Sequence, residues 1–456
     1  MARASRSQFV SFNKAAVDLS KPASKGLFST SSVWEKTGAN QAGSGILSPQ
    51  QELFRAVLRS FSDVAVVDVD RLAHLRGQEW QRLLYWLDIS GLALYFLDRL
   101  TQLGLAYVLP QSVFDRLQEN FRDNILRTRS MIEESIAIQH DFQKAGLSYA
   151  VMKGLSLTPD SVPRPELRHQ LDLDYLVAET SAPEARQILE RRGYRLYAIS
   201  EKTWEFKIHE IPHVSMKDLY KNLPYRAVEL HLESATQKQA SRLKRVVFRD
   251  MFGMTMPVFS PVDLFLGQAM HAFKDVCSAF SRAAHLLELY RHVLTHRYDV
   301  EFWSELRNRA GDDQKVCLGI GVVSCLLASI MGEFAPEALN VWTAEQLPAS
   351  IHLWIELYGQ RTVFSNNPGT KLYLLLQEEL EAAGVPGRRP IKKSLWPSRL
   401  PPLVVRAVAG ETVSTKIARY RLQLRFILSR MRFHLVEGLR YAVESYRWRK
   451  YLDRLS

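Results

Sequence analysis

The sequence predicts an α+β protein, with a small group of strands in the middle of the chain and helical regions on both sides. Three observations predict this class. Apolar residues recur at helical spacing before residue 145. Short apolar runs, several of them alternating with polar residues, lie between residues 146 and 260. Helical spacing then returns at Ser260 and continues to about residue 361.

The N-terminal part divides into two regions. Residues 1–45 are rich in Ser, Ala, Lys and Gly and lack periodicity, which is typical of a disordered arm. They contain no apolar segment of the kind found in a secretory signal, so we expect a cytoplasmic protein. Residues 46–145 form a helical region. Its last part, from Ser112 to about Ala145, is a long amphipathic stretch that leads directly into the first strand.

The most informative segment spans residues 170–177. Asp172 and Asp174 stand one residue apart inside an apolar run, so in a strand both carboxylates point to the same side. Two like charges repel each other, and burying either one without a partner is costly. A divalent cation such as Mg²⁺ removes both costs and leaves room for substrate phosphates. The alternative is an exposed edge strand with two ordinary surface aspartates.

Other reactive side chains flank this aspartate pair. An apolar strand pattern ends abruptly at Lys153-Gly154, where glycine permits a tight turn against a phosphate and lysine supplies a cation. Arg168 stands four residues before the first aspartate. Glu229 and His231 alternate with apolar residues, so they share one face of another strand. A third carboxylate on a neighbouring strand is what a two-metal phosphoryl-transfer site needs.

Two helix starts can also be predicted. Ser181, with Glu184 three residues later, has the pattern of a capping box, and the helix it opens should end before Gly193. Ser260-Pro261, followed by an acidic residue at the third helical position, predicts the start of the next helical region.

Together these elements resemble the bacterial family of uncharacterised nucleotidyltransferases, within the DNA polymerase beta-like nucleotidyltransferase superfamily. The family pattern is Lys-Gly, a spacer, Arg, then Asp-x-Asp, a helix that ends in Gly-Tyr, and a later Glu/Asp-x-His strand. The matching residues are Lys153-Gly154, Arg168, Asp172-Leu173-Asp174, Gly193-Tyr194 and Glu229-Leu230-His231. The match is close over about residues 145–235 and looser to about 300. It implies a palm-like mixed sheet in a nucleotidyltransferase core over residues 146–260.

The resemblance implies a metal-dependent enzyme that moves a nucleoside monophosphate from an NTP to an acceptor hydroxyl or phosphate. Asp172, Asp174 and Glu229 would be the catalytic residues and the ligands of Mg²⁺ or Mn²⁺. The residues that bind the nucleotide would be Lys153, Gly154, Ser156 and Arg168. The resemblance leaves the acceptor open among a small molecule, a sugar phosphate, a protein and an RNA.

The chain departs from the wider superfamily at one position. That superfamily has Gly-Gly or Gly-Ser where this chain has Lys153-Gly154, so the small hydroxyl that would bind the triphosphate is absent there. Ser156 is the nearest hydroxyl. Arg168 also has an alternative role, which is to pair with one of the aspartates when no metal is bound.

The C-terminal part divides into three segments: a helical domain at residues 261–385, a Pro-rich linker at 386–415, and a basic amphipathic helix at 416–456. Within the helical domain, residues 316–331 are apolar and uncharged. Because this run is short for a membrane span and contains glycines, we predict a buried helix.

The C-terminal helix carries most of the net charge. Of the formal net charge of +12, residues 416–456 supply +8, because they contain eleven basic and three acidic side chains. Their apolar residues follow a helical period: Ile417, Tyr420, Leu424, Leu428, Met431, Leu435 and Leu439. Three interpretations compete. The helix docks on the protein body with its basic face in solvent, attaches a peripheral protein to an anionic membrane surface, or contacts a nucleic-acid backbone.

The histidines do not predict a zinc site. Five histidines in and after the predicted core match no zinc-ligand spacing, namely His209, His213, His231, His271 and His285. We expect His231 to lie beside Glu229, and either His271 or Arg282 to face the cleft. The three cysteines do not form a disulfide framework or a metal-binding pattern.

A competing hypothesis belongs to a different functional class. The chain would then be a catalytically weak nucleotidyltransferase fold that acts as a binding or interaction module, attached to a membrane surface through residues 416–456.

Overall fold

The structure is a computed structural model. It describes residues 47–62, 69–200, 202–208, 218–223, 226–234, 241–387, 390–396 and 412–455. Residues 45–456 form one compact unit. The predicted arm at residues 1–45, His209, His213 and much of the Pro-rich linker lie outside the described residues. The finer domain boundaries proposed from the sequence remain predictions.

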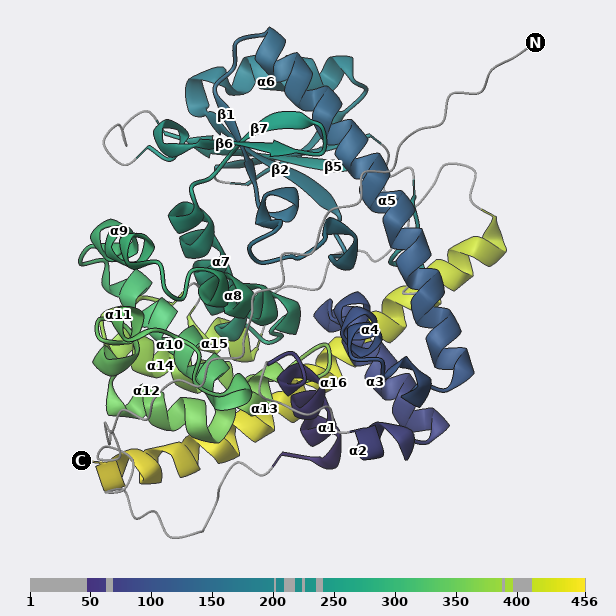
Figure 1. Ribbon diagram of the computed structural model, residues 1–456. Helices are drawn as coiled ribbons and strands as arrows, with labels where there is room; N and C mark the ends of the chain where they lie inside the picture. The colour runs from purple at the N-terminus through teal and green to yellow at the C-terminus, as the bar shows by residue number, and fades with distance from the viewer. Residues whose placement is uncertain are drawn as a thin grey trace. The chain divides into compact units, whose positions relative to one another are not determined.

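A seven-stranded mixed sheet occupies the middle of the chain, which confirms the predicted α+β class (Figure 1). Its strand order is β3-β4-β5-β2-β1-β7-β6. The strands are β1 (Tyr149–Met152), β2 (Asp172–Ala178), β3 (Arg195–Ser200), β4 (Thr203–Lys207), β5 (Ala227–Glu233), β6 (Val247–Met251) and β7 (Met254–Val258). Strand β2 pairs antiparallel with β1 and parallel with β5, so these three strands form the centre of the sheet.

The two faces of the sheet differ chemically because side chains alternate along each strand. One face is apolar and packs against α5 (Gln111–Lys144) and α6 (Ala182–Arg191) (Figure 1). On this face Leu173 and Tyr175 of β2 and Val228 of β5 are buried with residues of both helices. Tyr175 is also tied to α5 by a hydrogen bond of 2.9 Å between its hydroxyl and Ser135 Oγ. The opposite face therefore carries the polar residues of β2 and β5.

The helix predicted after β2 is present as α6, but the predicted capping box is wrong. Ser181 makes no side-chain hydrogen bond to the helix N-terminus, because its backbone (φ −92°, ψ −6°) is already helical. A capping serine needs an extended backbone, and here a 3-10 turn, η4 (Glu179–Ser181), runs directly into α6. The predicted end is confirmed, since Gly193 adopts a positive φ of 88° just after the helix.

The helical regions flank the sheet in sequence as predicted. Before it lie α1 (Pro49–Arg59), α2 (Val69–Ala73), α3 (Gly77–Ser90), α4 (Ala93–Gln102) and α5. After it lie α7 (Pro261–Val276), α8 (Ala283–Thr295), α9 (Val300–Ala310), α10 (Gln314–Met331), α11 (Glu337–Asn340), α12 (Ala349–Trp354), α13 (Gln360–Val363), α14 (Tyr373–Ala382), α15 (Ile391–Leu395) and α16 (Val413–Leu455). The predicted start of α7 is confirmed, because Ser260 Oγ accepts a hydrogen bond of 3.2 Å from the backbone N–H of Asp263.

Short turns complete the described secondary structure: η1 (Ala106–Val108), η2 (Gly154–Leu157), η3 (Pro165–Leu167), η7 (Leu243–Arg245), η8 (Ala344–Gln346) and the π-helical turn η9 (Ile355–Gly359).

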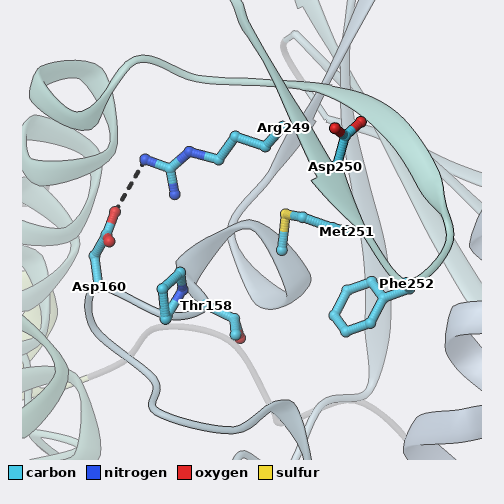
Figure 2. Close-up of a pocket in the computed structure, with 7 residues that line it drawn as sticks. Thr158, Asp160, Arg249, Asp250, Met251 and Phe252 are labelled. Carbon is cyan, nitrogen blue, oxygen red and sulfur yellow. Dashed lines mark hydrogen bonds and ion pairs between the residues drawn. The ribbon is translucent and has the colours of Figure 1, made fainter. Parts of the chain in front are cut away.

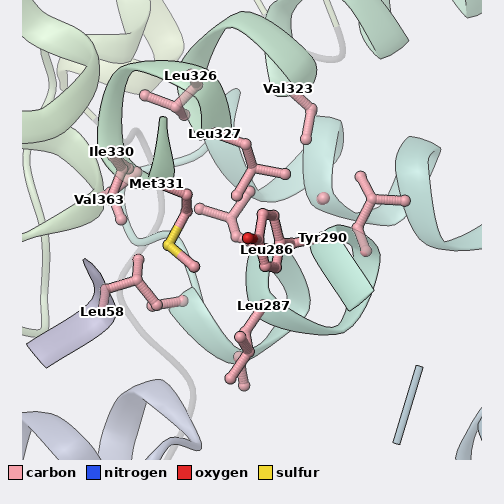
Figure 3. Close-up of a cluster of buried hydrophobic side chains, with 14 of the residues drawn as sticks. Leu58, Leu286, Leu287, Tyr290, Val323, Leu326, Leu327, Ile330, Met331 and Val363 are labelled. Carbon is pink, nitrogen blue, oxygen red and sulfur yellow. The ribbon is translucent and has the colours of Figure 1, made fainter. Parts of the chain in front are cut away.

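One apolar core joins the two helical regions. Figure 3 shows Leu58 of α1 beside Leu286, Leu287 and Tyr290 of α8 and Leu327, Ile330 and Met331 of α10. Among the described helices, α10 is the one long and apolar enough to cross a membrane, with a mean hydropathy of 1.8 over its 18 residues. However, 61% of it is buried inside the protein. It is a core helix here, as predicted for residues 316–331.

The C-terminal helix α16 contacts α12 and α14, but through a different face from the one its apolar pattern predicts. The predicted apolar positions are between 47% and 63% exposed. We call them the outer stripe: Ile417, Tyr420, Leu424, Leu428, Met431, Leu435 and Leu439.

The opposite face of α16 docks through polar contacts. The Tyr358 hydroxyl donates to Glu444 Oε2 at 3.0 Å, and Thr370 Oγ1 donates to Glu437 Oε2 at 2.7 Å. Trp448 is only 1% exposed and donates from Nε1 to Glu379 Oε1 at 3.0 Å. The helix is docked on the body, as one interpretation expected. Its acidic residues, not its apolar stripe, face the body because donors there satisfy them.

Candidate active site

The polar face of the sheet brings the predicted carboxylates together. Parallel pairing of β2 with β5 places Asp174 opposite Glu229, on strands about 4.8 Å apart. His231 Nε2 lies 2.9 Å from Asp174 Oδ1 and 3.3 Å from Glu229 Oε2. One potential ligand atom from each of these three residues lies within 4.8 Å of the other two. Asp172 points to the same face, two residues before Asp174 on β2.

Asp172 lacks a protein partner within the described part of the chain. No hydrogen bond or ion pair there reaches its carboxylate, although Gln170 Nε2 donates to its backbone oxygen at 2.7 Å. Burial, followed by repulsion from Asp174 and Glu229, raises the pKa of Asp172 from 3.8 to about 6, while Lys153 and Arg168 oppose this shift. Its environment therefore disfavours an ionised carboxylate unless a cation binds nearby.

Asp174 has the opposite environment although it is only two residues away. Burial would raise its pKa, but the hydrogen bond from His231 and the charge of Lys153 outweigh burial, so its pKa is lowered. Lys153 Nζ lies 2.9 Å from Asp174 Oδ1. The same contacts raise the pKa of Lys153 and of His231 in spite of burial. The sequence correctly placed His231 beside Glu229 but did not predict its contact with Asp174.

The Lys153-Gly154 turn depends on glycine for space. Both residues have a positive φ, 47° and 45° respectively. A Cβ on Gly154 would lie 2.2 Å from Gln170 Nε2, so a larger residue would displace Gln170 from the start of β2. The role of Gln170 depends on this close approach and could not be predicted from the sequence. Ser156 is buried and its hydroxyl donates to the carbonyl oxygen of Lys153 at 2.8 Å, so it stabilises the turn.

Arg168 is held by Glu288, a residue of α8 that lies 120 positions later in the chain. Its Nε donates to Glu288 Oε1 of α8 at 3.1 Å, and the Tyr95 hydroxyl of α4 donates to the same oxygen at 3.1 Å. Burial would lower the pKa of Arg168, but Glu288 outweighs it and the pKa is raised. The alternative in which Arg168 pairs with an aspartate is therefore wrong. The contacts of Glu288 with Arg168 and Tyr95 could not be predicted from the sequence, because these residues are distant along the chain.

A separate hollow of about 490 Å³ lies beside the β6–β7 hairpin (Figure 2). Its lining includes Thr158, Asp160 and Arg249 but none of the predicted site residues. Arg249 Nη2 lies 3.0 Å from Asp160 Oδ2, so these two charges neutralise each other, and Asp250 is the third charged residue of the wall (Figure 2). This hollow is therefore separate from the predicted site residues on the polar face of the sheet.

A comparison with known protein families finds a match over the part of the chain that contains these residues. The family described as "Uncharacterised nucleotidyltransferase" matches residues 76–314, just over half of the chain. The chain belongs to this family. The matched region extends further on both sides than the resemblance predicted, from the residue before α3 to the first residue of α10, and it contains every predicted site residue.

No curated protein matches this chain. Among solved structures, it is similar to an antigenic nucleotidyltransferase-like protein from Paracoccidioides brasiliensis, at 13% sequence identity. The similarity covers 40% of this chain and 87% of that one, with a TM-score of 0.27. A TM-score this low does not establish a shared fold.

Proposed function

We propose that this family member is a metal-dependent nucleotidyltransferase. It would move a nucleoside monophosphate from an NTP to an acceptor hydroxyl or phosphate and release pyrophosphate. The observation that carries the proposal is the convergence of Asp172, Asp174 and Glu229 on the polar face of the sheet, with the Asp172 carboxylate lacking a partner among the described residues. Membership of the polymerase beta-like superfamily is part of the same proposal.

The donor set fits a hard divalent cation. Asp172, Asp174 and Glu229 offer carboxylate oxygens, which Mg²⁺ and Mn²⁺ prefer, and burial, followed by repulsion from Asp174 and Glu229, raises the pKa of Asp172. When bound there, the ion would supply charge neutralisation for the triphosphate oxygens. Glu229 would also orient the acceptor oxygen and accept its proton.

The cationic residues would position the nucleotide. The Lys153 side chain is 42% exposed, so its ammonium group can reach a phosphate as well as Asp174. Gly154 permits close approach of the backbone. Arg168 is mostly buried and bound to Glu288, so it would act by contributing positive potential behind the phosphates. Ser156 would support the shape of the turn, and phosphate contact would require its bond to Lys153 to open.

Turnover of labelled NTPs tests the proposal. Purified protein is incubated with each NTP and Mg²⁺ or Mn²⁺, and pyrophosphate release is measured with acceptors from each class: small molecules, sugar phosphates, proteins and RNA. Asp172→Asn and Asp174→Asn should each reduce turnover by about 100-fold or more. Asp250→Asn, a change of the same type at an exposed position on β6, should retain wild-type turnover.

Two results would overturn the proposal. One is turnover that survives both aspartate changes. The other is a wild-type protein that shows no metal-dependent binding of any NTP, which would favour an interaction module.

We also propose that α16 binds an anionic membrane surface, which would make a cytoplasmic protein peripheral to the membrane. The outer stripe gives α16 an exposed apolar face, and Arg421, Arg425 and Arg432 lie within a turn of it. Two of the three acidic residues of the helix, Glu437 and Glu444, are buried against the body. The charge left at the surface is therefore strongly positive and complements anionic lipid headgroups.

The same charges disfavour two other occupants. A second copy of α16 would bring its own arginines against these, with mutual repulsion. A nucleic-acid backbone would leave the apolar stripe without a partner. Trp448, the tryptophan of α16, is buried against Glu379 and would not contact lipid.

Vesicle flotation tests the membrane proposal. The full chain should bind vesicles that contain phosphatidylserine and should bind neutral phosphatidylcholine vesicles much more weakly. Leu428→Glu, in the outer stripe, should weaken binding about tenfold or more. Ser429→Glu adds the same charge at a neighbouring position off the stripe and should have a smaller effect. Equal binding to both kinds of vesicle, or equal effects of the two variants, would contradict the proposal, as would a stable dimer that Leu428→Glu dissociates.

A further inference from the structure

Three metal-ligating side chains meet between α7 and α8, on elements other than the strands that carry the carboxylates. His271 and Asp275 are four residues apart on α7, so they lie one above the other on the same face. His285, in the first turn of α8, completes the group. One potential ligand atom from each residue lies within 4.8 Å of the other two.

The contacts inside this group are close. His285 Nδ1 lies 2.7 Å from Asp275 Oδ2. The rings of His271 and His285 have centroids 4.5 Å apart and are nearly perpendicular, at 81°. The His285–Asp275 hydrogen bond gives two of the three residues a partner. His271, by contrast, forms no hydrogen bond with any described residue. A partly buried imidazole without a partner, next to a histidine–carboxylate pair, is suited to receive a ligand.

The donor set selects a class of ion. Two imidazoles and one carboxylate suit zinc and similar first-row transition ions, whereas Mg²⁺ prefers oxygen donors alone. Histidine must be neutral to bind a metal. Burial, followed by repulsion from His285, lowers the pKa of His271 to about 4, and burial lowers the pKa of His285 to about 3. Both rings are therefore neutral at pH 7.

Two of the neighbouring cations are paired with carboxylates outside this group. Lys153 pairs with Asp174, and Arg168 pairs with Glu288. The Arg282 guanidinium lies against Gly91, at the C-terminal end of α3, where helix carbonyl groups favour a positive charge. Lys274, next to Asp275 in sequence, is the remaining cation that affects His271. The pairing of Lys153 and Arg168 with carboxylates reduces the repulsion that an added divalent ion would meet from them, whereas the charge of Arg282 acts on both Asp275 and His285.

We propose that His271, Asp275 and His285 form a binding site for a zinc-type divalent transition ion, separate from the Asp172–Asp174–Glu229 site. The side chains of Asp275 and His285 are 19% and 14% exposed, so solvent can reach the group. Three protein ligands leave one tetrahedral position for water or a substrate atom. The bound ion would also clamp α7 to α8 in the region matched by the nucleotidyltransferase family.

Cobalt titration tests this site, because Co²⁺ reports its ligands in the visible spectrum. The full-length protein with the Asp172→Asn and Asp174→Asn changes serves as background, and excess Mg²⁺ is present, so that the carboxylate site does not contribute. This protein should bind one equivalent of Co²⁺, and Zn²⁺ should displace it. His271→Ala should weaken binding about 100-fold or more, while His74→Ala, in the turn that follows α2, should have no effect.

A ligand replacement separates coordination from a structural role. His271→Cys should still bind Co²⁺ and should add a thiolate-to-cobalt charge-transfer band, which a role in packing alone cannot produce. Circular dichroism confirms that each variant is folded. The inference is overturned if the background protein binds no Co²⁺, if His271→Ala binds it as tightly as the background protein, or if His271→Cys lacks the charge-transfer band. None of these results depends on nucleotide transfer.

Discussion

Asparagine at position 172 should stabilise the metal-free protein at neutral pH, whereas asparagine at position 174 should destabilise it. The two aspartates lie on the same face of β2, yet their environments have opposite signs. Asp172 has no hydrogen-bonding partner among the described residues and a pKa raised to about 6. Asp174 contacts both Lys153 and His231 and has a lowered pKa.

The expected change in unfolding free energy for Asp172→Asn follows from the raised pKa of Asp172. A carboxyl group whose pKa rises on folding is more stable in its neutral form in the folded state. No cost is present below pH 3.8, where the group is protonated in both states, and the cost grows until the pH exceeds about 6. The rise from 3.8 to about 6 corresponds to roughly 3 kcal/mol of unfolding free energy at pH 7. Asp172→Asn should recover much of this, and its advantage should vanish near pH 4.

Asp174 responds in the other direction. A carboxylate with a lowered pKa stabilises the folded protein above its unfolded pKa, and this contribution is lost as the pH falls. Asp174→Asn leaves Lys153 and His231 without their shared acceptor. Because the Lys153 side chain is 42% exposed, solvent compensates part of the loss, so we expect a decrease of about 1–3 kcal/mol in unfolding free energy.

Urea denaturation at pH 4.5 and pH 7.5, with and without Mn²⁺, measures both effects. Without metal at pH 7.5 the order of stability should be Asp172→Asn, then wild type, then Asp174→Asn. Added Mn²⁺ should stabilise the wild type and have little effect on either variant. The reasoning is refuted if Asp172→Asn is no more stable than wild type at pH 7.5, or if Mn²⁺ stabilises all three proteins equally.

Three further predictions concern the surroundings of the site and the docking of α16. Gly154→Ala should lower the unfolding free energy by about 1–3 kcal/mol and abolish metal-dependent NTP binding, because its Cβ would clash with Gln170; calorimetric titration checks the binding, and unaltered binding would contradict this. Glu288→Ala should lower the free energy of unfolding by about 3–5 kcal/mol, measured by denaturation, because Arg168 would remain buried without a counter-charge. A decrease of less than about 1 kcal/mol would contradict this prediction. Trp448→Ala should lower the free energy of unfolding by about 3–5 kcal/mol, measured by denaturation, because the side chain is buried. Leu428→Ala, in the exposed outer stripe, should change it by less than about 0.5 kcal/mol. Equal losses for the two variants would contradict docking of α16 through the Trp448 face.

The polar face of the sheet could be predicted from local sequence patterns, because the direction of each side chain depends on strand periodicity. A period of two places Asp172 beside Asp174 and Glu229 beside His231, whichever strands are neighbours. The alignment of Asp174 with Glu229 depends on the pairing of β2 with β5. Here the family resemblance supplied what periodicity alone could not.

Contacts between distant segments could not be predicted from the sequence. Glu288, which holds Arg168, lies 120 residues later on a helix whose packing no local pattern specifies. The histidine group was missed for a related reason. Its ligands come from two helices and include Asp275, so no zinc-motif spacing exists to be recognised.

The orientation of α16 reversed the usual inference from amphipathicity. An apolar stripe normally faces the core, but Glu437 and Glu444 find donors on the body. Because these two glutamates contact Tyr358 and Thr370 on the body, the outer stripe on the opposite face of α16 is exposed at the surface. The composition of the partner surface, which no pattern within α16 reveals, decides the direction.

Anomalous diffraction from crystals grown with Mn²⁺ and a non-hydrolysable NTP tests the central claim most directly. The account predicts a manganese peak coordinated by Asp172 and Asp174, with the triphosphate bound beside the Lys153-Gly154 turn. A peak at another position, or a triphosphate bound away from these aspartates, would contradict it.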